Sequence, residues 1–270
     1  PILEEKQQRR AEMIKILEVY QPQEAWGHLA HLDTFEGPIF LMFGRDDPRQ
    51  KGYDIVASAI QQIPEGEAKY IFTPIPGDEG LDGLRFLKDL AEARAGEVKV
   101  FPFRMAQGYR ELQRGSSYLI MPSLYEPFGS ATEGYAAGTP VVARATGGLV
   151  QQIVPYPAGS LGLSVRRVTD KFHTRGAAPT GFLFREPAMP QANVISGWER
   201  MIACEYALPD TTRVQDRIGI HFFDAIAQEA AWTMADAVAL YMDHPAQYAQ
   251  MIANGFEMLK RFSWERAVRE

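Results

Sequence analysis

MPSLYEPFGSATEGYAAGTPVV, residues 121–142, is the stretch of sequence that decides the fold. It continues an apolar run that begins at Tyr118, turns at Glu126, and reaches a second apolar run at Pro140–Ala143. Gly129 and Ser130 open the helix that we predict between the two runs. A buried strand, a helix and a second buried strand in this order are typical of a βαβ unit, in which the two strands are parallel.

The same alternation extends outward along most of the chain. Short apolar runs occur at Pro38–Phe43, Lys69–Thr73, Val98–Phe103, Tyr118–Met121, Pro140–Ala143 and Gly181–Phe184. Each of the first four runs is followed by turn residues and then by a helix-like segment. The pattern predicts an α/β fold, a parallel sheet with helices on both faces. Such sheets bind ligands at the carboxyl ends of their strands, so we expect the functional residues just after the strands.

The ends and the later part of the chain have other patterns. We predict helices at 4–20, 195–206, 218–241 and 245–259, a connector at 21–37, and a long surface loop at 155–180. Met13, Leu17 and Tyr20 support the first helix because they share one stripe. We therefore divide the chain into an N-terminal helix and connector, 1–37, and a main domain, 38–270, with insertions at about 155–180 and 187–217.

Composition excludes several classes of protein. The chain has 270 residues, of which 46% are hydrophobic and 23% charged, so it is not a disordered chain. Its net charge of −6 disfavours non-specific nucleic-acid binding, and no apolar run is long enough to span a membrane. The single cysteine, Cys204, fits a reducing compartment, so we expect a cytoplasmic protein. Because the chain begins with Pro1, we expect it to be a piece of a longer protein.

Common cofactor and nucleophile motifs are absent from the sequence. It contains no G-x-G-x-x-G after the first strand, no P-loop, no H-E-x-x-H and no G-x-S-x-G. His28 and His31 lie three residues apart in the connector, and the simpler interpretation is two ordinary polar residues. We therefore expect no metal ion and no bound cofactor.

Two cations follow the first apolar run. Arg45 and Lys51 flank a turn that contains Asp46 and Asp47. Cations at the carboxyl end of a strand can neutralise a diphosphate. The turn is equally consistent with a solvated basic loop in which the two aspartates are local ion-pair partners.

The turn at Glu126 carries the strongest signal. Pro127 restricts Glu126 to an extended conformation, and Gly129 allows a ligand to approach the backbone closely. Free N–H groups at the start of the next helix favour an anion, while the carboxylate can accept hydrogen bonds from hydroxyl groups. This combination suits a ligand with a phosphate at one end and a polyol at the other. The alternative is a helix start with Ser130 as N-cap and Glu133 completing a capping box, and both can hold together.

A third turn follows the run at Pro140–Ala143. Gly147 and Gly148 would bring bare backbone to a ligand, and the alternative is an ordinary tight turn.

Three patterns in this order resemble the C-terminal half of a GT-B glycosyltransferase. They are R-x5-K-G at 45–52, P-S-x-x-E-P-F-G at 122–129 and G-T-P-V-V-A-R-A-T-G-G-L at 138–149. The sequence is most similar to bacterial glycogen and starch synthases, with which it also shares T-G-F-x-F at 180–184 and F-S-W at 262–264. The resemblance implies a Rossmann-like domain that binds a nucleotide-sugar donor.

The resemblance also implies roles for individual residues. Arg45 and Lys51 match the pair that binds the donor diphosphate, and Glu126 matches the acidic residue that holds the sugar hydroxyls. The implied donor contacts, beside these three, are Phe128, Gly129, Ser130, Thr132, Glu133, Gly147, Gly148, Phe103 and Arg104. Phe103 and Arg104 would lie against the base, although a buried Phe103 is the simpler interpretation. Glu133 would hold the ribose, but it stands seven positions after Glu126 where the family pattern has eight.

The function that the resemblance implies is that of a retaining, metal-independent glycosyltransferase. It would move glucose from ADP-glucose or UDP-glucose to an α-glucan, with the nucleotide sugar as substrate and no other cofactor. Since the family's acceptor-binding domain and its K-x-G-G loop are absent here, we expect this piece alone to be inactive. Two alternatives stay open: a transferase of the same fold with another donor or acceptor, as in sucrose, trehalose or cell-wall glycan synthesis, and a non-catalytic binding or regulatory module. The insertions and the altered glutamate spacing support the second alternative, but the presence of Arg45, Lys51 and Glu126 argues against it and favours the enzyme.

Overall fold

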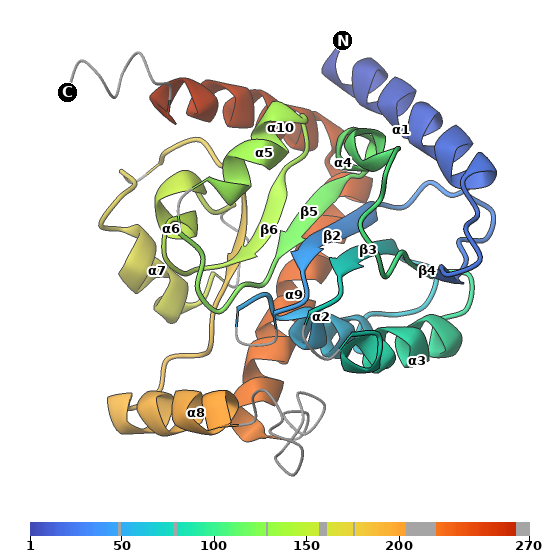
Figure 1. Cartoon of the computed structure of the whole chain (residues 1–270). Helices are drawn as coiled ribbons and strands as arrows, with labels where there is room; N and C mark the ends of the chain where they lie inside the picture. The colour runs from blue at the N-terminus through green and yellow to red at the C-terminus, as the bar shows by residue number, and fades with distance from the viewer. Residues whose placement is uncertain are drawn as a thin grey trace.

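A seven-stranded sheet forms the centre of the computed structural model (Figure 1), which describes residues 1–47, 50–77, 80–127, 129–156, 161–174, 176–203 and 220–262. The strand order is β1-β4-β3-β2-β5-β6-β7, and every neighbouring pair in this sheet is parallel except β1 with β4. The strands are β1 Trp26–Gly27, β2 Ile39–Arg45, β3 Lys69–Ile75, β4 Val98–Val100, β5 Tyr118–Met121, β6 Val141–Arg144 and β7 Gly181–Phe184. The predicted parallel α/β fold is confirmed.

The six predicted runs all form strands, and one further strand lies in the predicted connector. β1 pairs with β4 at the edge of the sheet, where Trp26 lies opposite Val100. The prediction for β4 was too long, because this strand ends at Val100 and not at Phe103.

Helices connect most of the parallel strands. They are α1 Ile2–Val19, α2 Tyr53–Ile60, α3 Arg85–Ala93, α4 Tyr109–Gly115, α5 Ser130–Ala136, α6 Leu149–Gln152, α7 Leu163–Thr169, α8 Gln191–Ala203, α9 His221–Asp243 and α10 Pro245–Leu259, with short 3-10 turns at Asp82–Leu84 and Lys260–Phe262. The prediction of an unbroken loop over 155–180 was wrong, because α7 lies within it. The helix predicted at 195–206 is present as α8 but begins earlier, and its predicted last residues lie outside the described part of the chain.

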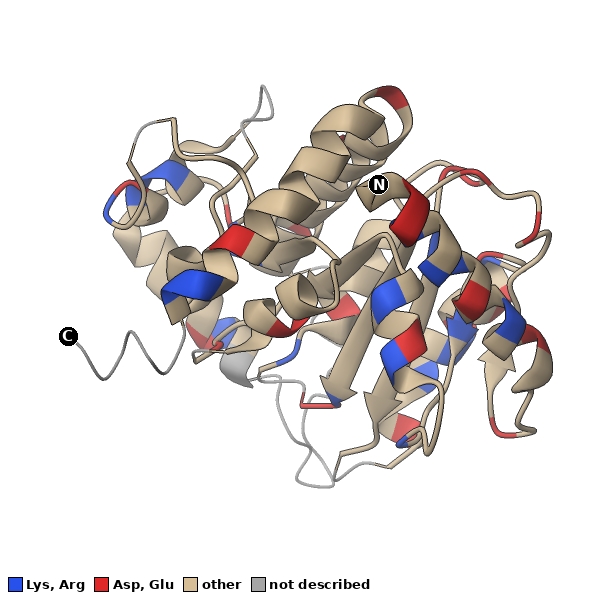
Figure 2. Ribbon diagram, turned by 90° about the horizontal axis from the view of Figure 1, so that it is seen from above, with Lys and Arg blue, Asp and Glu red and all other residues tan. Residues whose placement is uncertain are grey.

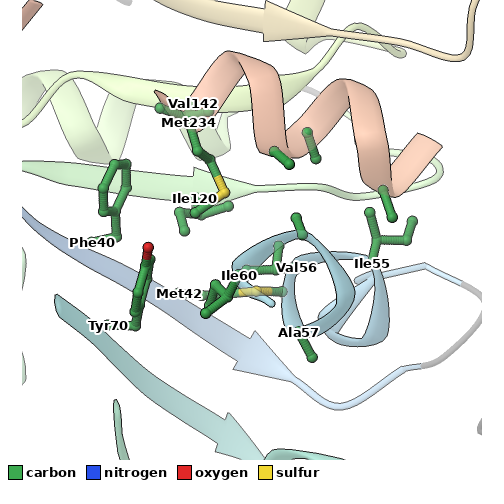
Figure 3. Close-up of a cluster of buried hydrophobic side chains, with 14 of the residues drawn as sticks. Phe40, Met42, Ile55, Val56, Ala57, Ile60, Tyr70, Ile120, Val142 and Met234 are labelled. Atoms are coloured by element: carbon green, nitrogen blue, oxygen red, sulfur yellow. The ribbon is translucent and has the colours of Figure 1, made fainter. Parts of the chain in front are cut away.

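Side chains of the sheet alternate between two hydrophobic clusters, one on each face. Along β2, Phe40 and Met42 pack into the cluster that includes α2, α3 and α9, whereas Ile39 and Leu41 pack into the cluster that includes α1, α4 and α5. Figure 3 shows the first cluster, in which Met234 of α9 lies over β5 and β6. Both faces of the sheet are therefore buried, which explains why its strands are continuous apolar runs.

Helix α1 is attached to the main domain at the end of the sheet away from the carboxyl edge of β5. The buried Lys6 ammonium donates hydrogen bonds to the carbonyl oxygens of Arg114 and Gly138 and to Thr139 Oγ1. Elsewhere on α1, acidic and basic residues alternate along its surface (Figure 2), and Arg9 pairs with Glu5 and Glu12. In the part of the chain that the structure describes, no helix has the length and apolarity required to cross a bilayer.

The strand order reverses between β2 and β5. The chain runs outward from β2 through β3 to β4 and then returns to place β5 on the other side of β2. At such a reversal the following helices leave toward opposite faces, and a crevice opens at the carboxyl ends of the two strands. The turns that follow β2 and β5 therefore meet at the position in the fold where ligands usually bind.

We expect Met234→Ala to lower the free energy of unfolding by about 2–5 kcal/mol, because it leaves a cavity between α9 and the sheet. Met234 is fully buried, while Met242 on the same helix is 47% exposed. Met242→Ala is therefore a matched control that should change stability by less than about 0.5 kcal/mol. Urea unfolding followed by circular dichroism measures both, and equal losses would contradict the packing of α9 on the sheet.

Candidate functional site

Three turns from neighbouring strands meet at the carboxyl edge of the sheet. Their described residues are 46–47 and 50–52 after β2, 122–127 and 129 after β5, and 145–148 after β6. Glu126 lies at their centre, since its side chain is bonded to the first turn and its backbone to the third. The structure thus brings together three of the segments that the sequence singled out.

The Glu126 carboxylate is bonded at both oxygens. Lys51 Nζ lies 2.8 Å from Oε2, and Ser123 Oγ donates to the same oxygen at 2.7 Å. Ser130 Oγ donates to Oε1 at 2.6 Å. The side chain of Lys51 is 20% exposed and that of Glu126 is 6% exposed, so the pair lies at the boundary between the core and solvent.

These contacts set the protonation state of Glu126. Burial alone would raise the pKa of this carboxyl, because it disfavours the charged form. The hydrogen bonds from Lys51, Ser130 and Ser123, together with the positive charge of Lys51, outweigh burial and hold the pKa below its ordinary value. Glu126 is therefore an acceptor of hydrogen bonds at neutral pH and not a proton donor.

The third turn supports Glu126 through the backbone. Gly148 N–H donates to the Glu126 carbonyl oxygen at 2.9 Å. Gly147 has φ +47°, and a Cβ atom there would lie 2.0 Å from the same oxygen. Glycine is therefore required at residue 147 for both its conformation and its close approach. Gly147 and Gly148 form a tight turn, which was the alternative to a role in ligand contact that the sequence left open.

The Glu126 turn is also tied to its neighbours at Leu124. The Leu124 carbonyl oxygen accepts hydrogen bonds from Arg144 at 2.9 Å and from Thr146 Oγ1 at 3.1 Å. The Leu124 N–H donates to the Gln50 carbonyl oxygen at 2.7 Å. The turn after β5 is thus bonded on one side to the turn after β2 and on the other to β6 and to Thr146 in the turn that follows it.

The start of α5 differs from the predicted capping box. Gly129 is the N-cap. The Ser130 hydroxyl donates its hydrogen bond to the Glu126 carboxylate and does not cap a backbone N–H of the helix. The N–H of Ala131 is bonded instead to Oε1 of the buried Gln152, at 3.2 Å. The first N–H groups of α5 have no acceptor within the helix, as at any helix start, and the anion site there stays a prediction.

The remaining predicted donor contacts are more scattered. Arg45 ends β2 with its side chain exposed, and Thr132 Oγ1 donates to the Gly129 carbonyl oxygen. Glu133 is exposed on α5, where Gln113 Nε2 approaches it at 3.5 Å. Phe128 lies outside the described residues.

The two predicted base contacts follow a different strand. Phe103 is half-buried and packs edge-on against Phe101, with 6.2 Å between ring centroids, and Arg104 is exposed. Since β3 separates β4 from β2, these two residues lie farther along the same edge and not beside Glu126.

Sequence reasoning did not select four residues that shape the site. Ser123 donates a hydrogen bond to the Glu126 carboxylate, and Gln152 accepts one from the first turn of α5. Arg144 and Glu186 form a buried ion pair of 2.6 Å. Ser123 could have been found from its position in the P-S-x-x-E pattern. The other three bond to residues on distant parts of the chain and leave no local pattern.

The arrangement places the Lys51 ammonium and the Glu126 carboxylate together at one edge of the sheet. It suits a ligand that carries both anionic oxygens and hydroxyl groups. Among the residues that the structure describes, no group of three or more His, Cys, Asp or Glu side chains is placed to hold a metal ion.

Comparison with known proteins gives a family match that includes this edge of the sheet. Residues 32–164 match the family model described as Glycosyl transferases group 1. The solved structure of Anabaena Alr3699/HepE in complex with UDP and glucose is 18% identical, with a TM-score of 0.50 over 84% of this chain and 45% of that one. That likeness supports the fold.

Curated relatives carry two kinds of name. The D-inositol 3-phosphate glycosyltransferase of Nocardiopsis dassonvillei is 27% identical over 198 residues, 69% of this chain and 46% of the relative. The protein of the same name from Streptomyces coelicolor is 40% identical over 121 residues, 41% of this chain and 26% of the relative. The glycogen synthase of Desulfatibacillum aliphaticivorans is 37% identical over 111 residues, 38% of this chain and 21% of the relative. The chain thus spans less than half the length of these relatives.

We expect Gly147→Ala to lower the free energy of unfolding by about 3 kcal/mol or more, because its Cβ would displace the Glu126 carbonyl as well as strain the backbone. Gly66 also has a positive φ, of +86°, but open space around its Cβ position. Gly66→Ala should therefore show the backbone strain alone, about 1–2 kcal/mol. Urea unfolding compares the two variants, and similar losses would argue against the close contact at residue 147.

Replacement of Glu126 by Gln should make the stability of the protein less dependent on pH. The folded-state pKa of Glu126 lies below its ordinary value of 4.5, so its carboxylate stabilises the fold above that value. This contribution is lost as the pH falls through the lower, folded value. The wild type should exceed Glu126→Gln by about 1–3 kcal/mol at pH 7, and the gap should close in acid.

Urea unfolding of both proteins between pH 7 and about pH 3 tests this dependence. Glu257→Gln is the control, because Glu257 is an exposed glutamate that pairs with Lys260 on the surface. A gap between wild type and Glu126→Gln that stayed constant down to low pH would show that the carboxylate is not held in its charged form.

Proposed function

Because residues 32–164 carry a glycosyl transferases group 1 domain, we propose that this chain is the donor-binding half of a retaining glycosyltransferase. It would move glucose from ADP-glucose or UDP-glucose to an α-glucan, as in glycogen and starch synthesis. The observation that carries the proposal is the Lys51–Glu126 pair at the point where the strand order reverses, and the exposed Arg45 stands at the end of β2.

The cations would bind the diphosphate of the donor. Arg45 ends β2 and Lys51 closes the turn that follows it, so both can reach a ligand in the crevice between β2 and β5. As the bond from the sugar to the diphosphate breaks, negative charge grows on the leaving phosphate. Cations that are already in place stabilise that charge without reorganisation, which is electrostatic preorganisation.

Glu126 would take over a new set of partners when the donor binds. Lys51 leaves its pair with Glu126 for the phosphate oxygens, and the freed carboxylate oxygen accepts hydrogen bonds from the hydroxyls of the sugar. Ser123 and Ser130 keep the carboxylate in place during this exchange. Its role is to orient the sugar, and it forms no covalent bond with it.

Acceptor binding would come from another part of the protein. This chain covers 46% of the first relative and 21% of the glycogen synthase. The residues that bind the acceptor are expected to lie in a part of the full-length protein that this chain does not include. We therefore expect this chain to bind the donor but not to transfer the sugar by itself.

A second candidate function differs in the acceptor. Two relatives are named D-inositol 3-phosphate glycosyltransferase, and one of them matches 69% of this chain. A phosphorylated cyclic polyol would then replace the glucan, while Arg45, Lys51 and Glu126 would keep their roles toward the donor. Transfer assays of the full-length protein with both acceptors distinguish the two candidates.

Isothermal titration with ADP, UDP, GDP, ADP-glucose and UDP-glucose tests the donor site in this chain. We expect saturable binding of one nucleotide and its sugar, weakened about tenfold to a hundredfold by Lys51→Ala, because the variant loses a charge-assisted hydrogen bond to phosphate. Lys88→Ala is the control, since Lys88 is exposed on α3.

Two outcomes would contradict the proposal. Equal binding by wild type and Lys51→Ala would remove Lys51 from the donor site. Binding of no nucleotide by either this chain or the full-length protein would instead favour a module that keeps the fold without the chemistry.

A further inference from the structure

A buried arginine lies directly beneath the Glu126 turn. Arg144, the last residue of β6, is 2% exposed. One terminal nitrogen donates to the Leu124 carbonyl oxygen at 2.9 Å, and the other lies 2.6 Å from Glu186 Oε2. Because Leu124 stands two residues before Glu126, the position of this guanidinium sets the path of the turn that carries the carboxylate.

The charge of Arg144 is incompletely matched by its polar neighbours. Among the described residues its carboxylate partner is Glu186, which is shared with Arg185, whose Nε lies 3.1 Å from Oε1. The Nε of Arg144 has no hydrogen-bond partner among the described residues. A buried guanidinium in this state needs further stabilisation if it is to stay in place.

The aromatic ring of Trp198 supplies that stabilisation. The Cζ atom of Arg144 lies 4.6 Å from the centroid of this ring, within the range of a cation–π contact. Trp198 belongs to α8, in the segment that the sequence marks as an insertion. An inserted helix therefore contacts the arginine that holds the Glu126 turn.

Trp198 is itself held firmly against the start of α9, beside which α8 lies (Figure 1). Its ring meets that of Phe222 edge-on, with 5.3 Å between centroids. A Cβ atom at the preceding residue, Gly197, would lie 2.4 Å from the Phe222 ring, so the two helices approach closely at this point. The ring that contacts Arg144 is thus also packed against α9.

We propose that Trp198 is a positioning residue of the donor site, which acts through Arg144 to hold the Leu124 carbonyl and with it the Glu126 turn. The effect on a ligand rests on the proposed function, whereas the effect on the turn does not. Helix α8, which lies in the inserted segment, then helps to hold the Glu126 turn in position. Loss of the ring should affect the sugar that Glu126 binds more than the diphosphate that Arg45 and Lys51 bind.

Amide hydrogen exchange tests the effect on the turn without a ligand. Two amides report on the turn: that of Leu124, which donates to Gln50, and that of Gly148, which donates to Glu126. The amide of Ala30, which donates to Gly96 away from the turn, is the internal reference. We expect Trp198→Ala to speed exchange at the first two about tenfold and to leave Ala30 unchanged. Trp198→Phe should restore most of the protection, because it keeps a ring.

Trp232→Ala provides the matched control, since Trp232 is 56% exposed on α9 and should leave all three amides unchanged. Faster exchange at Ala30 as well as at the other two amides in Trp198→Ala would indicate a global loss of stability and would overturn the proposal. Unchanged exchange at Leu124 and Gly148 would overturn it too.

Titration with the nucleotide sugar and with the nucleotide alone distinguishes an effect on sugar binding from an effect on diphosphate binding. Trp198→Ala should weaken binding of the nucleotide sugar about tenfold and binding of the nucleotide alone less than about threefold. Equal weakening of both would contradict a role through Glu126. If the wild type binds neither ligand, the proposed function fails in this chain, and the exchange experiment still decides whether Trp198 positions the turn.

Discussion

The contact between the Glu126 carbonyl oxygen and the turn at Gly147 and Gly148 is the constraint on which the site depends. The Gly148 N–H donates to this oxygen, and the absence of a side chain at Gly147 allows the two backbones to meet. With the backbone held there, the carboxylate can reach Lys51 from the neighbouring strand. Backbone packing thus determines where the charged groups stand, and the ion pair follows from it.

The strand order brings this contact next to the turn that carries Lys51. β5 and β6 lie side by side, and β2 lies on the other side of β5, so three turns from separate parts of the sequence share one edge. The edge is also where the order reverses, which opens space for a ligand between β2 and β5. A site of three turns can combine cations, a carboxylate and backbone donors that no single turn could present together.

The sequence predicted most of the fold because buried parallel strands are continuous apolar runs. It could not predict β1, because a two-residue edge strand has no periodicity, or α7, a short helix among glycines and prolines. The resemblance to GT-B glycosyltransferases implied that Lys51 and Glu126 belong to one site, and their side chains lie 2.8 Å apart. The contact from Arg144 to Leu124 left no trace in the sequence, since a carbonyl oxygen is the same in every residue, and the contact from Trp198 joins distant segments.

The backbone and the side chain of Glu126 have separate partners, and this separation bears on how such a site can evolve. The carbonyl is bonded to Gly148, and the carboxylate to Lys51, Ser123 and Ser130. A substitution at this position would change the side chain presented at the edge of the sheet while the main chain kept its bond to Gly148. The chemistry of the edge can therefore vary by single side chains, at the cost of the carboxylate's own bonds but without loss of the backbone contact that shapes the turn.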